Sequence, residues 1–217
     1  MGSKLTRVGM TAIVIASLGA FSAAPAVAKK KSKTKTVSAT YNKCVDLSQA
    51  IPDPASTASG PAVVARTPIT IPKLKGKFQD GAVTSFTSAG LRIAHTYAGD
   101  ITANLVSPGG AVVTLTNGRG DTADGFGTGP ASCAGSLVLF GDSFLGSLLT
   151  LPAADDTPVS GSFKAEQPLS TFVGGRARGD WLLIVSDASS SDLGSLNALS
   201  LNFTYSYKAR AKSSKKK

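Results

Sequence analysis

The feature that most constrains the fold is a strict alternation of side-chain character along residues 199–207. Leucine, phenylalanine and tyrosine occupy every second position, and serine, asparagine and threonine occupy the positions between them. Alternation with a period of two indicates a β-strand with one face on a core and the other in water. A helix does not fit this pattern, because its apolar positions recur every three to four residues.

Four shorter runs with less regular alternation occur at residues 91–97, 101–106, 111–116 and 181–185. Clusters of Gly, Pro, Asn and Asp separate them, as expected for turns between strands. The sequence shows no long amphipathic helical pattern. We therefore predict an all-β fold, an antiparallel β-sandwich of the jelly-roll type, in preference to a sheet with crossover helices.

The first residues carry the pattern of a secretory signal. Lys4 and Arg7 precede an uncharged stretch that ends in small residues at Ala28, as a signal peptidase requires. We expect cleavage there, which makes residues 1–28 a signal peptide and the protein secreted or extracellular. The alternative is an uncleaved anchor, since residues 8–28 are long enough to cross a bilayer.

Export determines how the two cysteines, Cys44 and Cys133, are interpreted. Outside the cytosol, two thiols in a small domain normally end as a disulfide, and with two cysteines a single intramolecular pairing exists. Such a bond would close a loop of roughly 90 residues, worth about 4 to 5 kcal/mol in the chain-entropy account. The alternative is two unpaired, buried or intermolecular cysteines.

The formal net charge of +10 comes from two lysine-rich stretches. Residues 29–35 hold five basic residues and residues 208–217 hold six, whereas residues 36–207 hold ten against all 13 acidic ones. We expect both stretches to be disordered tails that attract an anionic cell-wall polymer or lipid headgroups, without specific binding of nucleic acid. A purely solubilising role is the alternative.

These observations divide the chain into segments. After the signal we expect a basic, Pro-, Ser- and Ala-rich N-terminal segment at residues 29–67. Residues 51–72 predict an irregular lead-in to the sandwich with one short strand around Ile69 and Ile71. The β-sandwich is expected at residues 68–207, and a Lys-rich disordered tail at residues 208–217.

Five sequence blocks carry a resemblance to a known family. In chain order they are IAHTYAGDI at residues 93–101, NLVSPGG at 104–110, QPLSTFVGG at 167–175, GDWLLIVSD at 179–187 and GSLNALSL at 194–201. These blocks resemble the P domain, also called the Homo B domain, of the kexin and furin type proprotein convertases. The resemblance covers roughly residues 68–207 and implies a jelly-roll β-sandwich of about eight strands.

In the convertases the P domain is a stabilising companion of a subtilisin-like catalytic domain. The resemblance therefore implies a non-catalytic, proteolysis-associated module whose partner is a secreted subtilisin-like peptidase. The motif residues to which it gives a structural role are His95, Tyr97, Asp100, Trp181 and Asp187. In the last block Leu199 stands where the family usually has tryptophan, and residues 117–144 match none of the family's blocks.

His95 is the sole histidine, so any mechanism that needs an imidazole depends on it. Its order with Asp100 and Ser143 superficially resembles a serine-protease triad. The match fails because Phe144 and Leu145 follow the serine where an oxyanion loop needs glycine. His95 also shares strand parity with apolar residues, so we interpret it as a buried structural histidine and the chain as a non-enzyme.

Several aspartates lie in or beside predicted turns, where their carboxylates are available to Ca²⁺. The weak calcium candidates are Asp100, Asp142, Asp187 and Asp192. Asp187 and Asp192 flank a serine-rich turn, and some P domains bind calcium. The competing interpretation, that aspartate favours turns and caps N–H groups, ranks ahead because no DxDxDG spacing occurs.

The alternative function is a cell-surface or glycan-binding module tethered by its basic tails. Jelly rolls commonly bind glycans on an open face, but such sites expose several aromatic side chains. Here Trp181 and most tyrosines occupy positions of core parity. The accessory role beside a peptidase is therefore the preferred prediction.

Overall fold

The computed structural model describes residues 34–52, 63–69, 81–150, 157–190 and 192–210. All of them belong to one unit, Ser32–Lys217. The predicted signal peptide with its cleavage after Ala28, and the predicted strand position Ile71, lie outside the described residues and stay predictions.

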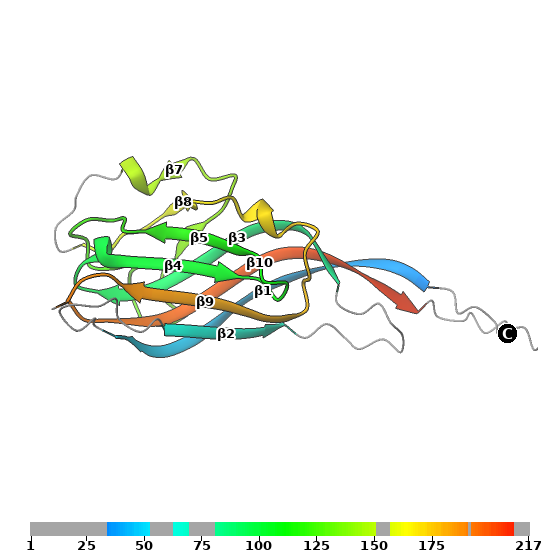
Figure 1. Ribbon diagram of the computed structural model, residues 1–217, viewed down its shortest axis with the longest axis horizontal. Coiled ribbons are helices and arrows are strands. Elements are labelled where there is room, and N and C mark those ends of the chain that lie inside the picture. Colours follow the sequence, from blue (N-terminus) through cyan, green and yellow to red (C-terminus); the bar gives the residue numbers. More distant parts are fainter. Residues whose placement is uncertain (1–33, 53–62, 70–80, 151–156, 191, 211–217) are drawn as a thin grey trace, which may run out of the picture. The chain divides into compact units, whose positions relative to one another are not determined.

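Within the described residues, the strands form two sheets that pack face to face (Figure 1). One sheet has six strands in the order β1-β10-β3-β6-β8-β7, and the other has four in the order β2-β9-β4-β5. The strands are β1 (Thr34–Ile51), β2 (Val63–Ile69), β3 (Ala82–His95), β4 (Ile101–Val106), β5 (Val112–Asn117), β6 (Val138–Phe140), β7 (Gly146–Ser147), β8 (Ser162–Lys164), β9 (Gly179–Asp187) and β10 (Gly194–Arg210).

The pairing is antiparallel along β1, β10, β3 and β6 and throughout the four-stranded sheet. The two pairs that β8 makes, with β6 and with β7, are parallel. The predicted all-β sandwich is confirmed, with this short parallel edge as an addition. Its jelly-roll type stays a prediction.

Three short 3₁₀ helices complete the described structure: η1 (Ala98–Asp100), η2 (Leu148–Thr150) and η3 (Leu169–Phe172). Among the residues that the structure describes, no helix has the length and apolar character needed to span a bilayer.

The core is centred on Trp181, which projects from β9 between the sheets. Its ring lies 5.5 Å from Phe86 and 5.2 Å from Phe203 of the six-stranded sheet, and 5.0 Å from Phe172 of η3, measured between ring centroids. The indole is fully buried, and its N–H donates to the main-chain oxygen of Ala177 at 3.1 Å. These contacts bury large apolar area and also satisfy the one polar group of the indole.

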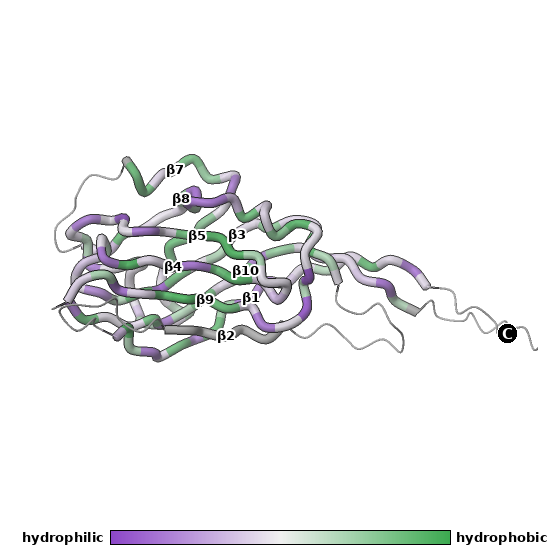
Figure 2. The backbone as a smooth tube through the Cα atoms, viewed as in Figure 1, coloured by the Kyte–Doolittle hydropathy of each residue, from purple (hydrophilic) through white to green (hydrophobic). Residues whose placement is uncertain are grey.

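The strand predicted from strict alternation is the most reliable part of the sequence interpretation. Residues 199–207 lie inside β10, where Leu199, Leu201, Phe203 and Tyr205 are buried and the residues between them are partly exposed. The run at 101–106 coincides with β4, and the other runs differ from β3, β5 and β9 mainly at their ends. Figure 2 shows hydrophobic residues recurring along the strands of the sandwich.

The sandwich begins earlier than the predicted boundary at residue 68, because β1 and most of β2 lie before it. β1 pairs with β10 along nearly its whole length. Val37, Ala39 and Tyr41 alternate with exposed polar residues in β1, and all three are partly buried. Lys35 and Lys43 occupy positions of the same parity as these three residues, so they interrupt the alternation at both ends.

The lysine-rich tails also begin further out than predicted. Lys35, Lys208 and Arg210 lie in the ladder between β1 and β10, whose outermost pairs are Thr34 with Arg210 and Thr36 with Lys208. An antiparallel ladder fixes these backbones, so the expectation of disorder is wrong for residues 208–210. Residues 29–33 and 211–217 lie outside the described residues.

Candidate functional site

His95 and Asp187 form a buried pair that joins the two sheets. His95 ends β3 and Asp187 ends β9, and the imidazole Nε2 lies 3.1 Å from the carboxylate Oδ2. Both side chains are fully buried. The other ring nitrogen, Nδ1, lies 2.8 Å from the main-chain oxygen of Tyr97. Both nitrogens of the imidazole thus contact structural partners.

The structure does not assemble the superficial triad. The carboxylate that contacts His95 is that of Asp187, not that of Asp100. Ser143 lies in the exposed turn after β6, and the described hydrogen bonds of His95 do not include it. A serine nucleophile needs an imidazole nitrogen free to accept its proton, and neither nitrogen is free here.

Three further aspartates gather around this pair, and we call the set of Asp100, Asp121, Asp187 and Asp192 the acidic end. The Tyr97 hydroxyl donates to Asp121 at 3.0 Å, and the Thr96 hydroxyl donates to Asp192 at 2.7 Å. Asp121 and Asp192 are therefore both hydrogen-bonded to the segment that follows His95. The acidic end is therefore held together by hydrogen bonds as well as by the fold.

The electrostatics of the acidic end follow from this crowding. Burial raises the pKa of Asp100, and the negative charges of Asp187 and Asp192 raise it further, against a smaller lowering effect of His95. The hydrogen bond to Asp121, and then its charge, raise the pKa of the Tyr97 hydroxyl. Like charges at close range thus disfavour ionisation of Asp100.

Three of the four calcium candidates, Asp100, Asp187 and Asp192, meet at the acidic end. The fourth does not: the Asp142 carboxylate accepts the N–H groups of Leu169 and Ser170, at 2.7 and 2.8 Å, at the start of η3. Asp142 is thus a capping residue.

The carboxylates at the acidic end already accept protein hydrogen bonds. Besides His95, Asp187 accepts the N–H of Ser189 at 3.1 Å, while Asp192 accepts from Thr96. In the described ranges no set of three or more His, Cys, Asp or Glu side chains is arranged to hold a metal ion. Calcium binding at Asp100, Asp187 and Asp192 stays a prediction.

The described surface includes two depressions with polar and apolar lining. One, of about 480 Å³, opens beside His95 and is lined by Thr96, Asp124 and Leu193 among others. Leu193 is 70% exposed there. Leu193 is thus an exposed apolar side chain beside the acidic end.

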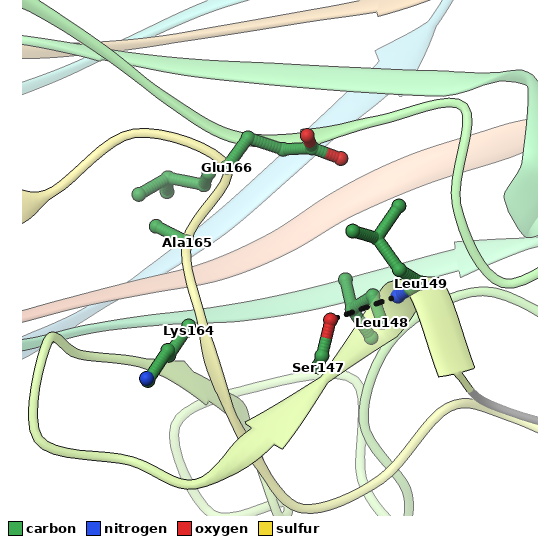
Figure 3. Close-up of a pocket in the computed structure, with 7 residues that line it drawn as sticks. Ser147, Leu148, Leu149, Lys164, Ala165 and Glu166 are labelled. Atoms are coloured by element: carbon green, nitrogen blue, oxygen red, sulfur yellow. Dashed lines mark hydrogen bonds between the residues drawn. The ribbon is translucent and has the colours of Figure 1, made fainter.

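The other depression, of about 210 Å³, lies between β5 and the β7–β8 edge (Figure 3). Leu115, Leu148, Leu149 and Ala165 supply its apolar lining. Figure 3 shows Lys164 and Glu166 pointing away from each other across Ala165. We call it the β5–β8 hollow.

The margin of the β5–β8 hollow combines a salt bridge with exposed leucines. Arg119 Nε lies 2.6 Å from Glu166 Oε1, with both side chains partly exposed. Leu149 is 64% exposed and the nearby Leu145 is 95% exposed. Exposed leucines beside an apolar hollow offer a contact surface to a partner.

A strap of residues 126–136 crosses the outer face of the six-stranded sheet. Phe126 and Ile93 exchange main-chain hydrogen bonds of 2.8 and 2.9 Å at one side of β3. The guanidinium of Arg92 donates to the main-chain oxygens of Phe126, at 3.3 Å, and Gly129, at 3.1 Å. Arg92 is 8% exposed, and burial lowers the pKa of its guanidinium.

A disulfide between Cys44 and Cys133 fastens the far side of the strap to β1, as predicted. The Cα atoms are 5.8 Å apart, and 89 positions separate the two residues. The Asp46 carboxylate adds a second anchor by accepting the N–H of Cys133 at 2.6 Å.

Sequence reasoning missed both Arg92 and Asp46. Strand parity places Arg92 on the face opposite the core. Arginine is common on an exposed face, so nothing in the sequence indicates that a loop covers this one. Only the pairing of Cys44 with Cys133 indicates that Asp46 lies close to Cys133.

Comparisons with known proteins agree with this description. Residues 85–131, from within β3 to the middle of the strap, match the family model for the proprotein convertase P-domain. No curated protein matches the sequence.

Two similar solved structures are the serine protease of Aeromonas sobria, alone and in complex with the chaperone ORF2. Each is 14% identical with a TM-score of 0.43, over 79% of this chain. The chain spans 27% of the length of those proteins.

The matched segment contains His95, Tyr97 and Asp100, which build the acidic end, together with Arg92, which holds the strap. The family match covers residues 85–131, and this part of the chain is similar to the proprotein convertase P-domain.

Proposed function

We propose that this chain is a non-catalytic accessory domain that associates with a secreted serine-type endopeptidase and stabilises it. The observation that carries the proposal is the P-domain match over residues 85–131. The matched segment contains His95, Asp100 and Asp121 at the acidic end and the first half of the strap.

The environment of His95 supports the non-catalytic part of the proposal. The imidazole is buried, and both of its nitrogens contact Asp187 and the main chain of Tyr97. A general base must reach a substrate proton, directly or through one water molecule. His95 instead links the ends of β3 and β9, so its role is structural.

Glycan binding is less well supported. Among the described residues, the large hydrophobic side chains that are exposed are all aliphatic: Val112, Leu145, Leu149, Val173 and Leu193. Sugar rings stack on aromatic faces, and the Trp181 ring is enclosed by Phe86, Phe172 and Phe203.

The experiment that tests the proposal uses the full chain as bait in the culture medium of its source. A fluorophosphonate probe, which labels active serine hydrolases, then identifies captured endopeptidases. We expect a labelled peptidase that loses activity more slowly on heating when the chain is present. The chain alone should not react with the probe.

Two matched variants locate the contact. Leu149→Asp alters the β5–β8 hollow and Leu193→Asp alters the acidic end, and both leucines are exposed, so neither change should unfold the sandwich. Loss of capture in one variant alone identifies the binding face. A chain that captures no probe-reactive protein, or that leaves the inactivation rate of the peptidase unchanged, contradicts the proposal.

A further inference from the structure

β1 is the outermost strand of the six-stranded sheet (Figure 1). It pairs with β10 on one side, and the register of this pair is regular from Thr34 to Asp46. No described main-chain hydrogen bond joins residues 34–46 to an element other than β10. We call the side of residues 34–46 that faces away from β10 the open edge.

The open edge offers main-chain hydrogen-bonding groups to another extended chain. In an antiparallel pair, alternate residues direct both their N–H and their C=O to the partner strand, and the residues between them direct both groups away. Roughly half of residues 34–46 therefore present an N–H and a C=O at the open edge. Such a row is a template for a further strand.

The other described sheet borders differ from the open edge. β5 is covered, because the N–H of Gln167 donates to the main-chain oxygen of Thr114 at 3.1 Å and the N–H of Thr114 donates to the Gln167 side chain at 2.9 Å. β7 has two residues. β2 has seven, and one of them is Pro68, which has no N–H to donate. Among the described borders, β1 therefore offers the longest regular edge.

Val37, Ala39 and Tyr41 form the inward row of β1, and all three are partly buried. The Tyr41 ring stacks on Phe203 of β10, with ring centroids 5.4 Å apart. A strand added at the open edge places its own inward side chains beside this row, with about 5 Å between Cβ atoms. Apolar side chains at those positions would cover the surface of the inward row that the sandwich leaves exposed.

Lys35 and Lys43 lie at the two ends of the inward row. Both have the same strand parity as the row, and both are exposed. Charged side chains at inward positions protect an edge strand, because they oppose unspecific pairing. A partner strand with a carboxylate opposite each lysine instead gains two cross-strand ion pairs. The first acid along β1 is Asp46, which has the opposite parity and does not compete with such a partner.

The same lysines disfavour a second copy of this chain as the occupant. When two open edges pair about a twofold axis, the two inward rows lie on one face of the joined sheet. The register that places Ala39 opposite its own symmetry mate aligns both inward rows, but it also places Lys35 opposite Lys43 twice. Like charges directly opposite each other destabilise a strand pair. A segment of a different protein is therefore the better occupant.

We propose that the open edge binds an extended segment of a partner protein as an additional antiparallel strand. Three alternate apolar side chains of the segment lie opposite Val37, Ala39 and Tyr41. Two positions beyond them on each side, a carboxylate lies opposite Lys35 or Lys43. Main-chain hydrogen bonds supply the affinity, and the apolar row with its two charges supplies the specificity. This contact is independent of the proposed association with a peptidase.

The test uses the full chain and a nine-residue synthetic peptide, labelled for fluorescence polarisation. The peptide has Glu at both ends, Val at the third, fifth and seventh positions and Thr between them. We expect saturable binding of one peptide per chain, and NMR should show slower amide exchange at alternate residues within 34–46. Absence of saturable binding at millimolar peptide, or slowing that centres on another element, would overturn the proposal.

Two N-methylated peptides distinguish an added strand from an unspecific apolar contact. One carries methyl groups on the main-chain nitrogens of its odd positions, and the other on those of its even positions. In an added strand only one of the two sets faces β1. One peptide should therefore lose about tenfold or more in affinity, while the other stays within about twofold of the parent. Equal losses for both peptides would overturn the proposal.

Lys43→Glu tests the charge pairs, and Lys164→Glu is the matched control, because both lysines are exposed on strands. Lys43→Glu should weaken binding of the Glu-ended peptide about fivefold and strengthen binding of a Lys-ended peptide. Lys164→Glu should change neither affinity by more than about twofold. Equal effects of the two variants would show that only net charge matters and would overturn the proposal. Unchanged thermal midpoints confirm that the variants fold.

Sedimentation of the unaltered chain tests the competing occupant. We expect a monomer at concentrations at which the peptide binds. A dimer that the peptide dissociates would assign the open edge to a second copy of the chain and would overturn the proposal.

Discussion

The two ends of β10 differ in burial, in charge and in the strands with which they pair. At Gly194 the strand lies between β1 and β3, next to the buried pair of His95 and Asp187 at the acidic end. At Arg210 it pairs with β1 alone, outside the sandwich. One strand thus connects a buried, negatively charged region to an exposed, positively charged one.

The two ends of β10 therefore contribute differently to the stability of the fold. Buried polar pairs are expensive to disrupt, whereas exposed lysines contribute little to folding and are available for ligands. Substitutions at the acidic end should therefore change the free energy of unfolding. Substitutions in the outer ladder, at residues 34–37 and 207–210, should leave that free energy nearly unaltered.

The largest effect is expected for Asp187→Ala. It leaves the buried imidazole of His95 without its carboxylate partner and removes the acceptor for the N–H of Ser189. The free energy of unfolding should fall by about 3 to 5 kcal/mol, measured by urea denaturation. Asp192→Ala is the control, because it removes an exposed hydrogen bond and should cost about 1 kcal/mol. Equal costs for both variants would contradict the structural role of the buried pair.

The next effect is expected for loss of the disulfide. Cys44→Ser with Cys133→Ser frees the strap from β1, and the unfolded chain loses the constraint of a loop of 89 positions. We expect a decrease of about 2 to 4 kcal/mol in the free energy of unfolding. Reduction of the native protein should reproduce it. Unchanged urea midpoints in both experiments would show that Arg92 and the main-chain contacts of Phe126 suffice to hold the strap.

A smaller effect of opposite sign is expected for Asp100→Asn. Folding raises the pKa of Asp100 above its ordinary value of 3.8, so the folded state binds this proton more tightly than the unfolded chain does. The contribution of Asp100 to stability therefore falls as the pH rises from below 3.8 through the raised value.

At neutral pH the Asp100→Asn variant should gain less than about 1 kcal/mol, because the side chain is only partly buried. Its advantage should vanish below pH 3.8, which thermal unfolding across the acid range would reveal. A variant less stable than the wild type at neutral pH would show that the carboxylate of Asp100 is favourable where it lies.

The smallest effect is expected at the other end of β10. Lys35→Gln with Lys208→Gln should change the free energy of unfolding by no more than about 0.5 kcal/mol, because both side chains are exposed. Urea denaturation of this variant beside Asp187→Ala compares the two ends directly. A cost as large as that of Asp187→Ala would remove the distinction between them.

The sequence predicted those parts of the fold in which local pattern and packing agree. Residues 199–207 alternate strictly because β10 lies on the core, and 101–106 corresponds to β4 without adjustment. β1 escaped prediction because lysines interrupt the alternation of an edge strand. The two cysteines predicted their own pairing once export was assumed, and the structure contains that bond.

The arrangement of the candidate site depends on contacts between distant segments. That Asp100, Asp187 and Asp192 share one end while Asp142 caps η3 follows from the order of strands in the sheets. Spacing along the chain could not distinguish them, since all four lie in or near turns. The meeting of the two basic stretches likewise required the register of β1 with β10.

Hydrogen exchange along β10, measured by mass spectrometry, tests the difference between its ends most directly. We predict strong protection of the amides from Leu196 to Phe203, and exchange through local opening at residues 207–210. Equal protection along the whole strand would contradict the account.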